Sequence, residues 1–348
     1  MIAPGVVEAF QLQALISPQL GSPLYGRLLE YATTDLQNGG LLAEIVDGWQ
    51  GHAVTDAMPL RLLGAVHRLV LDGAAPQLAR YYPSTGGEPE WPQTWDAFLD
   101  VVAGQRDFVR SRLACQVQTN EVSRSAALLG GFLHIAARTG LPLRLFEIGS
   151  SAGLNLLWDR YRYEAGPHRW GDPASPVLIR SEWHGAPPAL TTPLQVDRRS
   201  GCDLSPIDIR DPEQVRMLES FVWPDQLERL TQLRAAVALA RRDPPPVVQQ
   251  RAGSWLREQL EAAPSGIAIV VFHSIMWWYL SESERTAVVD AIEARGARAS
   301  RTAPLAWLQL EVRGSDRADL ALRLWPGGEE IILGGSHPHG REVWWAEG

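Results

Sequence analysis

From about residue 141 onward, short apolar runs alternate with helical patterns, and this alternation constrains the fold more than any other feature of the chain. The runs occupy residues 143–148, 267–273 and 304–312, and the segment 283–296 between the last two has helical spacing. Continuous apolar runs of this length are typical of strands buried on both faces. Because strands that alternate with helices form parallel βαβ units, we predict an α/β fold with a mainly parallel sheet.

The two ends of the chain differ from this central pattern. Before residue 141 the apolar residues recur at helical spacing, which predicts helices at 6–16, 24–32, 59–71, about 94–113 and 120–140. Asn120 is expected to act as the N-cap of the last of these helices. Near the C-terminus, the residues from 318 to 345 indicate antiparallel strands around a Pro-Gly-Gly turn. The sequence therefore predicts an all-helical N-terminal region over 1–118 and an α/β region over 119–348.

Composition excludes several classes of function. The chain contains no lysine, so all 32 basic residues are arginine, and the net charge is −8. Phosphate-loop NTPases, protein kinases, pyridoxal enzymes and Schiff-base aldolases all need a lysine. The acidic charge provides no basic footprint for nucleic acid or for an anionic membrane. We therefore expect a small-molecule partner, and the sequence does not indicate an oligomeric state.

Few residues suggest metal binding, disulfides or membrane insertion. Cys115 and Cys202 lie far apart without a CxxC pattern, and His337 and His339 have no third histidine or cysteine nearby, so neither a metal site nor a disulfide framework is expected. The longest nearly apolar stretch, 267–280, is too short to cross a bilayer. The first ten residues show no basic leader, which favours a cytoplasmic protein.

A small-residue turn follows the first predicted strand. In the segment LFEIGSSAGLN (145–155), Gly149, Ser151 and Gly153 recur at every second position before a helical run begins. Glycine lets a backbone turn tightly and approach a ligand closely, and the start of a helix presents free N–H groups. The dinucleotide fingerprint G-x-G-x-x-G does not fit, because no glycine lies between Gly149 and Gly153.

The pattern Glu147-x-Gly149-x-Ser151-x-Gly153-x-Asn155 resembles motif I of class I S-adenosylmethionine-dependent methyltransferases. Ser151 stands where that motif usually has its middle glycine. The resemblance implies a Rossmann-like, mainly parallel sheet, with S-adenosylmethionine as the cofactor. It also implies that these five residues bind the cofactor.

A second segment, SGCDLSPIDI (200–209), resembles the end of the second strand in the same family, where an acid binds the ribose hydroxyls. Asp203 is the matching residue, and a carboxylate can accept two hydrogen bonds from a cis-diol. Asp203 follows Gly149 by 54 positions (203 − 149), whereas about 20 is typical. We therefore predict an insertion at about 162–192, with Glu182 inside it as the competing ribose acid.

A third segment, 267–296, resembles the fourth strand and the following helix of methyltransferases, where the strand end leads into the active site. His273 and Trp277 are the catalytic candidates there, although adjacent tryptophans also pack in ordinary cores. His273 would act as a base only for an acceptor that must lose a proton. Asn120 lies on the helix before the first strand, which can cover the cofactor in this family. The third strand is expected within 245–256, whose end lacks the acid that often contacts adenine.

The methyltransferase resemblance covers about residues 120–348. The whole chain also resembles an uncharacterised bacterial family that joins a helical N-terminal region to this half and shares stretches such as 119–126 and 222–230. The predicted function is methyl transfer to a small molecule. The second reading is a methyltransferase-like protein that binds a ligand or a partner without turnover.

A rival interpretation uses the same turn. The pattern Gly149-x-Ser151-x-Gly153 matches the nucleophile elbow of α/β-hydrolases, in which Ser151 would be the nucleophile. An acid, Asp203 or Asp208, and a later histidine, His273, His337 or His339, would complete the triad. That fold needs several strands before the elbow and an upstream oxyanion loop. The sequence indicates helices before the turn and contains no such loop.

Overall fold

The computed structural model describes residues 5–262, 264–314 and 317–346, and its chain folds into two compact units. The helical unit consists of residues 5–119 together with Asp211–Thr231. The sheet unit consists of Asn120–Arg210 and the described residues of 232–346. The second predicted region ran without interruption from 119 to 348, whereas Asp211–Thr231 packs within the helical unit. The first four residues and the last two of the predicted regions lie outside the described residues.

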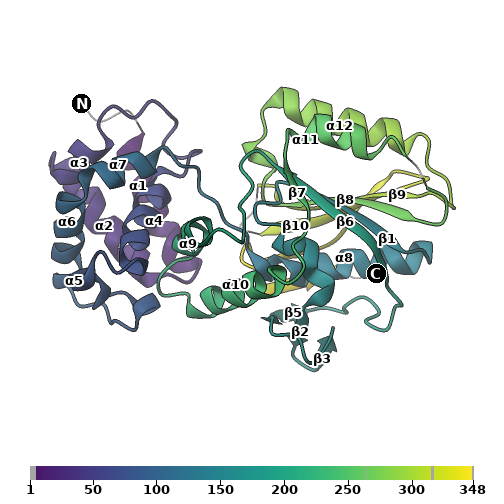
Figure 1. Cartoon of the computed structure of the whole chain (residues 1–348), viewed down its shortest axis with the longest axis horizontal. Coiled ribbons are helices and arrows are strands. Elements are labelled where there is room, and N and C mark those ends of the chain that lie inside the picture. Colours follow the sequence, from purple (N-terminus) through teal and green to yellow (C-terminus); the bar gives the residue numbers. More distant parts are fainter. Residues whose placement is uncertain (1–4, 263, 315–316, 347–348) are drawn as a thin grey trace. The chain divides into compact units, whose positions relative to one another are not determined.

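The helical unit contains helices at or near the predicted positions, and the pattern at about 94–113 forms two of them (Figure 1). Ser22 begins the second helix as its N-cap, since its hydroxyl accepts from the N–H of Tyr25. Apolar faces of these helices form one buried core. The elements are α1 (Val6–Gln19), α2 (Pro23–Gln37), α3 (Leu41–Val46), α4 (Met58–Leu71), α5 (Pro76–Ala79), η1 (Pro83–Thr85), α6 (Gln93–Gly104), α7 (Arg106–Leu113) and α9 (Pro212–Ser220), and α10 (Leu227–Ala240) begins in this unit.

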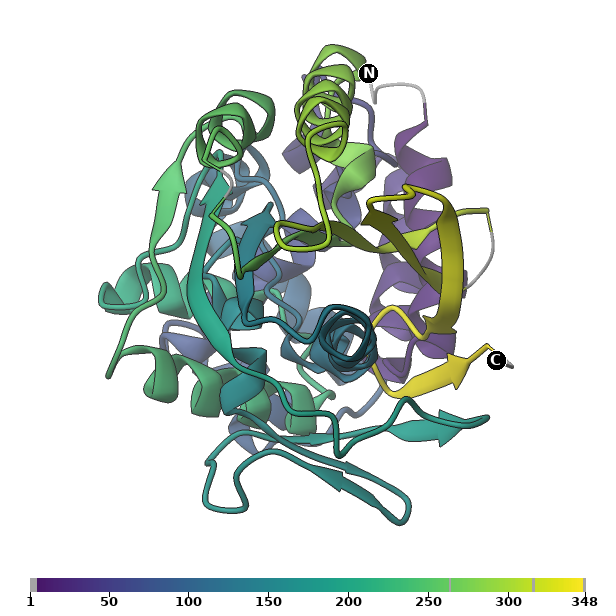
Figure 2. The same cartoon turned by 90° about the vertical axis from the view of Figure 1, so that its right-hand side faces the viewer.

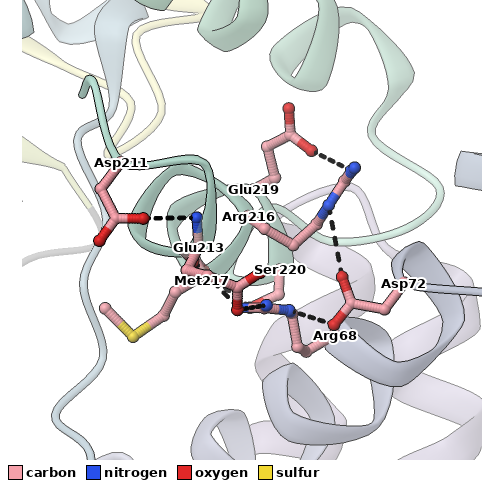
Figure 3. A network of polar contacts seen from close by, with 8 residues as sticks. All are labelled: Arg68, Asp72, Asp211, Glu213, Arg216, Met217, Glu219 and Ser220. Atoms are coloured by element: carbon pink, nitrogen blue, oxygen red, sulfur yellow. Dashed lines mark hydrogen bonds and ion pairs between the residues drawn. The ribbon is translucent and has the colours of Figure 1, made fainter. Parts of the chain in front are cut away.

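The segment Asp211–Thr231 is bound to α4 through a buried arginine (Figure 3). The guanidinium of Arg68 donates to the Asp72 carboxylate at 2.5 Å, and to the backbone carbonyl and the carboxylate of Glu213 at 3.0 and 2.5 Å. Arg216 pairs with Glu219 at 2.7 Å and approaches Asp72 at 3.5 Å. Trp223, farther along the segment, belongs to the helical core. The segment is therefore part of this unit, although it is interleaved in sequence with the strands of the other.

The sheet unit is built on a nine-stranded sheet in the order β5-β12-β11-β10-β9-β8-β1-β6-β7. The strands from β7 to β9 pair in parallel, those from β9 to β12 pair antiparallel, and β5 pairs in parallel with β12. The fold is thus α/β with a large, mostly parallel central sheet. Its strands are β1 (Leu143–Ile148), β5 (Glu182–His184), β6 (Val196–Asp203), β7 (Val247–Gln249), β8 (Ala268–Ser274), β9 (Leu305–Val312), β10 (Ala318–Trp325), β11 (Glu330–Ser336) and β12 (Glu342–Trp345).

Helices cover both faces of the sheet (Figures 1 and 2). Side chains alternate between the faces along a strand, and Glu147 of β1 lies in register with Phe272 of β8. Phe272 meets Phe132 of α8 (Ser125–Thr139) edge to face, with ring centroids 5.2 Å apart, so this face lies under α8. Phe146 meets Trp255 of α11 (Ala252–Gln259), which packs beside α12 (Glu282–Gly296) on the opposite face.

Two predicted elements differ from the structure. The third strand, expected within 245–256, is limited to the three residues of β7, because α11 begins at Ala252. The region predicted as an insertion, about 162–192, holds a separate three-stranded sheet in the order β3-β2-β4 and the short strand β5. The small sheet consists of β2 (Arg162–Ala165), β3 (His168–Trp170) and β4 (Leu178–Arg180). Among the described residues, no helix is both long and apolar enough to cross a membrane.

Candidate functional site at the carboxyl edge of the sheet

The order of the parallel strands reverses beside β1. Strands β6 and β7 lie on one side of β1, while β8 and β9 lie on the other. In open α/β sheets, ligands bind outside the carboxyl ends of the strands at such a switch point. The segments that follow β1, β6 and β8 meet there and are called the carboxyl edge below.

The turn after β1 takes its shape from three residues in the left-handed region. The φ angles of Gly149, Ser151 and Gly153 are +68°, +53° and +71°. A Cβ atom on Gly153 would lie 2.8 Å from the side chains of Pro245 and Val247, and one on Gly149 would lie 2.8 Å from the Met276 side chain. The contact at Gly153 is with two stiff side chains, so glycine is required there sterically, whereas the contact at Gly149 is with the flexible side chain of a methionine. Ser151 occupies a conformation that a third glycine would adopt at lower cost.

Asp203 lies beside this turn although 52 positions separate it from Ser151. Its Oδ2 accepts from the backbone N–H of Ser151 at 2.8 Å, and its Oδ1 accepts from the N–H of Ser205 at 2.8 Å. Because each carboxylate oxygen has a second lone pair, the anchored group can still accept from a ligand. Glu182, the competing acid, lies on β5, which is an outermost strand of the sheet, whereas the turn follows β1 between β8 and β6. Glu182 therefore does not reach this turn.

Glu147 is the most unusual group at the carboxyl edge. Its residue is 2% exposed, and its Oε2 has no hydrogen-bond partner among the described residues. Burial raises the pKa of Glu147 well above its usual value, and the charge of Asp203 raises it further, while Arg124 and the hydroxyl of Ser150 act in the opposite direction. Buried polar atoms are nearly always hydrogen-bonded, so this oxygen is available to a polar group of a ligand.

The two asparagines act on the element that follows the turn. Asn120 does not cap the helix before β1, because that helix, α8, begins only at Ser125, after the 3₁₀ turn η2 (Val122–Arg124). Its Oδ1 instead accepts from the N–H of Leu154 at 2.9 Å, and Asn155 donates to the carbonyl of Glu121 at 3.3 Å. The predicted helix is a seven-residue 3₁₀ helix, η3 (Leu154–Arg160), and its first N–H is already bonded. The expected free N–H group at that position is therefore absent.

His273 faces the opposite side of the sheet from Glu147. It follows Phe272 on β8, so its side chain lies on the α11 face, where its ring stacks on Trp277 at 5.2 Å between centroids. Its Nδ1 hydrogen-bonds to Oε1 of Glu311 at 2.7 Å, and its Nε2 has no partner among the described residues. A carboxylate only accepts, so Nδ1 carries a proton.

Glu311 was missed by the sequence analysis. It lies within the predicted strand 304–312, where a charged residue among apolar neighbours was the available signal. Besides bonding to His273, its Oε1 accepts from the N–H groups of Met276 and Trp277 at 3.0 and 3.3 Å. One buried oxygen therefore organises the start of the segment after β8.

Ser151, Asp203 and His273 do not form a hydrolase triad. Ser151 has the positive φ that a nucleophile elbow requires. However, neither ring nitrogen of His273 bonds to Ser151, and the carboxylate of Asp203 accepts from backbone N–H groups. Over the described part of the chain, no strand precedes β1. The described residues contain no group of three or more His, Cys, Asp or Glu side chains that could hold a metal ion.

Comparison with known proteins identifies one relationship. Residues 7–345 match the model of a family described as "Uncharacterized protein conserved in bacteria (DUF2332)". No curated protein and no solved structure matches the chain significantly.

Proposed function

We propose a function from the carboxyl edge alone, since the chain belongs to the bacterial family DUF2332 and the description of this family names no activity. The proposal is that the sheet unit binds S-adenosylmethionine and transfers its methyl group to a small molecule. The five parallel strands, numbered in chain order, lie in the order 3-2-1-4-5. This is the order of a Rossmann-like sheet, and the glycine turn follows its first strand.

The observation that carries the proposal is the unpartnered oxygen of Glu147 beside the anchored carboxylate of Asp203. An ammonium group on the ligand would supply the donor that Glu147 lacks. The cis-diol of a ribose would use the free lone pairs of Asp203. Gly149 and Gly153 would let this ligand approach the backbone of the turn.

The charges at the turn favour this cofactor over a dinucleotide. A pyrophosphate needs free N–H groups at a helix start. Here the N–H groups of Ser151, Gly153 and Leu154 are bonded to Asp203, Ser150 and Asn120. The carboxylate of Asp203 at the turn would also repel an anion. S-adenosylmethionine carries a sulfonium, an ammonium and a carboxylate, so its net positive charge complements the acidic groups at the turn.

When bound, the cofactor would supply an electrophilic methyl group, and the chain's contribution is to align the acceptor with it. His273 and Trp277 are the catalytic candidates that the sequence predicts. Since His273 is fully buried against Trp277, we propose that both residues position the segment after β8. The acceptor is then one that needs no base from His273.

Calorimetry with S-adenosylhomocysteine on the full chain tests the cofactor site. We expect binding to wild type and no binding of NAD. Asp203→Ala should weaken binding about tenfold or more, because one charge-assisted hydrogen bond contributes about 1.5–3 kcal/mol. Asp208→Ala is the matched control, since Asp208 accepts from the N–H of Arg210 in the same loop. Preference for NAD, or equal effects of the two substitutions, would contradict the proposal.

Glu147 provides a second readout that does not depend on turnover. Its raised pKa favours a protonated carboxyl in the free protein, and a ligand ammonium would favour the carboxylate. Binding should therefore release a proton, and affinity should rise with pH. Calorimetry in two buffers of different ionisation enthalpy measures this proton, and Glu147→Gln should abolish its release.

A further inference from the structure

A strained and braced segment follows β8 at the carboxyl edge. Ile275 has a φ of +49°, a conformation that β-branched residues rarely adopt. The segment is held on one side by Glu311, which accepts from the N–H groups of Met276 and Trp277. On the other side, Arg285 of α12 donates to the carbonyls of Trp277 and Trp278 at 3.1 and 3.0 Å. A buried acid and an arginine thus maintain a backbone shape that is unfavourable by itself.

This bracing presents two aromatic rings to solvent. Trp278 and Tyr279 are 59% and 57% exposed, and their rings meet edge to face with centroids 5.6 Å apart. The two preceding residues, Met276 and Trp277, are less exposed. Trp277 stacks on His273, and the Met276 side chain lies against Gly149 of the turn after β1. Strained backbone that survives only because its surroundings fix it is concentrated at functional sites.

We propose that Trp278 and Tyr279 form the acceptor-binding surface of the methyl-transfer site, and that the acceptor is a neutral aromatic nitrogen heterocycle. This inference rests on the proposed function. A planar ring can stack on an exposed indole, and stacking on an aromatic side chain is a strong, shape-based interaction. Because His273 is buried under Trp277, its imidazole is not available to an acceptor as a base.

A ring nitrogen with a free lone pair meets this requirement. Its lone pair forms the new N–CH₃ bond while the electron pair of the breaking S–CH₃ bond stays on sulfur. The positive charge moves from the sulfonium to the ring, and no proton is released. The cationic product would then lie on Trp278, the ring type that attracts cations most strongly.

Quinoline is the probe for this surface, with cyclohexanone as a neutral, non-aromatic control. We expect the full-length protein labelled with 5-fluorotryptophan to show a ¹⁹F shift of the Trp278 signal on addition of quinoline but not of cyclohexanone. That signal is identified by its absence in Trp278→Phe. Titration should show that Trp278→Leu and Tyr279→Leu each weaken quinoline binding about tenfold, and that N-methylquinolinium binds more tightly than quinoline.

S-adenosylhomocysteine binding is measured on the same samples to separate this inference from the proposed function. Trp278→Leu should keep that affinity within about twofold, as should Leu15→Ala, which alters an exposed apolar residue of the helical unit. Equal quinoline affinity in wild type and Trp278→Leu would overturn the acceptor surface whether or not the cofactor binds. Quinoline binding that depends on Trp278, in a protein without affinity for S-adenosylhomocysteine, would retain the aromatic site and overturn methyl transfer.

Discussion

Replacing Gly153 with alanine tests the geometry of the turn most directly. The φ of Gly153 is +71°, and an added Cβ would lie 2.8 Å from the Cγ of Pro245 and from a methyl group of Val247. The left-handed conformation alone costs an alanine about 1–2 kcal/mol. Forcing a methyl group into a packed position costs about 1–3 kcal/mol more. We therefore expect Gly153→Ala to lower the free energy of unfolding of the sheet unit by about 2–5 kcal/mol.

Gly140→Ala is the matched control for this substitution. Gly140 ends α8 with a φ of +64°, and no atom lies within 4 Å of the position of its Cβ. Both variants therefore share the backbone cost and the change in unfolded-state entropy, so the difference between them isolates the contacts with Pro245 and Val247. Urea denaturation followed by circular dichroism should give a difference of about 1–3 kcal/mol. Equal destabilisation would refute the close approach of the turn to β7.

Three further predictions concern single groups. Ser151→Gly should leave stability unchanged or raise it by about 1 kcal/mol and keep S-adenosylhomocysteine binding, since glycine adopts the positive φ freely; covalent labelling of Ser151 by a fluorophosphonate would instead support the hydrolase. Because the folded-state pKa of Glu147 is raised, its stabilising contribution is complete below pH 4.5 and is lost as the pH rises; in melting curves, Glu147→Gln should therefore be more stable than wild type at pH 8, with the gap closing toward pH 4.5. Arg68→Met should destabilise the helical unit by about 2 kcal/mol, and Arg216→Met, at a more exposed pair, by less than about 1 kcal/mol in urea titrations.

The local sequence pattern was sufficient to predict a strand, helix or turn wherever the residues next to a segment in sequence decide its structure. The apolar run at 143–148 is β1 with the predicted bounds, and 283–296 lies within α12. The small residues at 149 and 153 indicated a turn because only glycine adopts a positive φ without cost. The Pro-Gly-Gly turn near the C-terminus likewise joins two antiparallel strands.

Tertiary structure decided which distant groups share a location. Glu311 bonds to His273 across 38 positions of the sequence. Asn120 bonds to the N–H of Leu154 across 34 positions, although the residue type and position of Asn120 suggested a helix cap. The placement of Asp211–Thr231 in the helical unit also depends on contacts that are distant in sequence, such as those of Arg68. Side-chain periodicity records which face of an element is buried, but it carries no information about the element that covers that face. The order of the strands is likewise decided by the tertiary structure, and it places the ends of β1, β6 and β8 at one edge of the sheet.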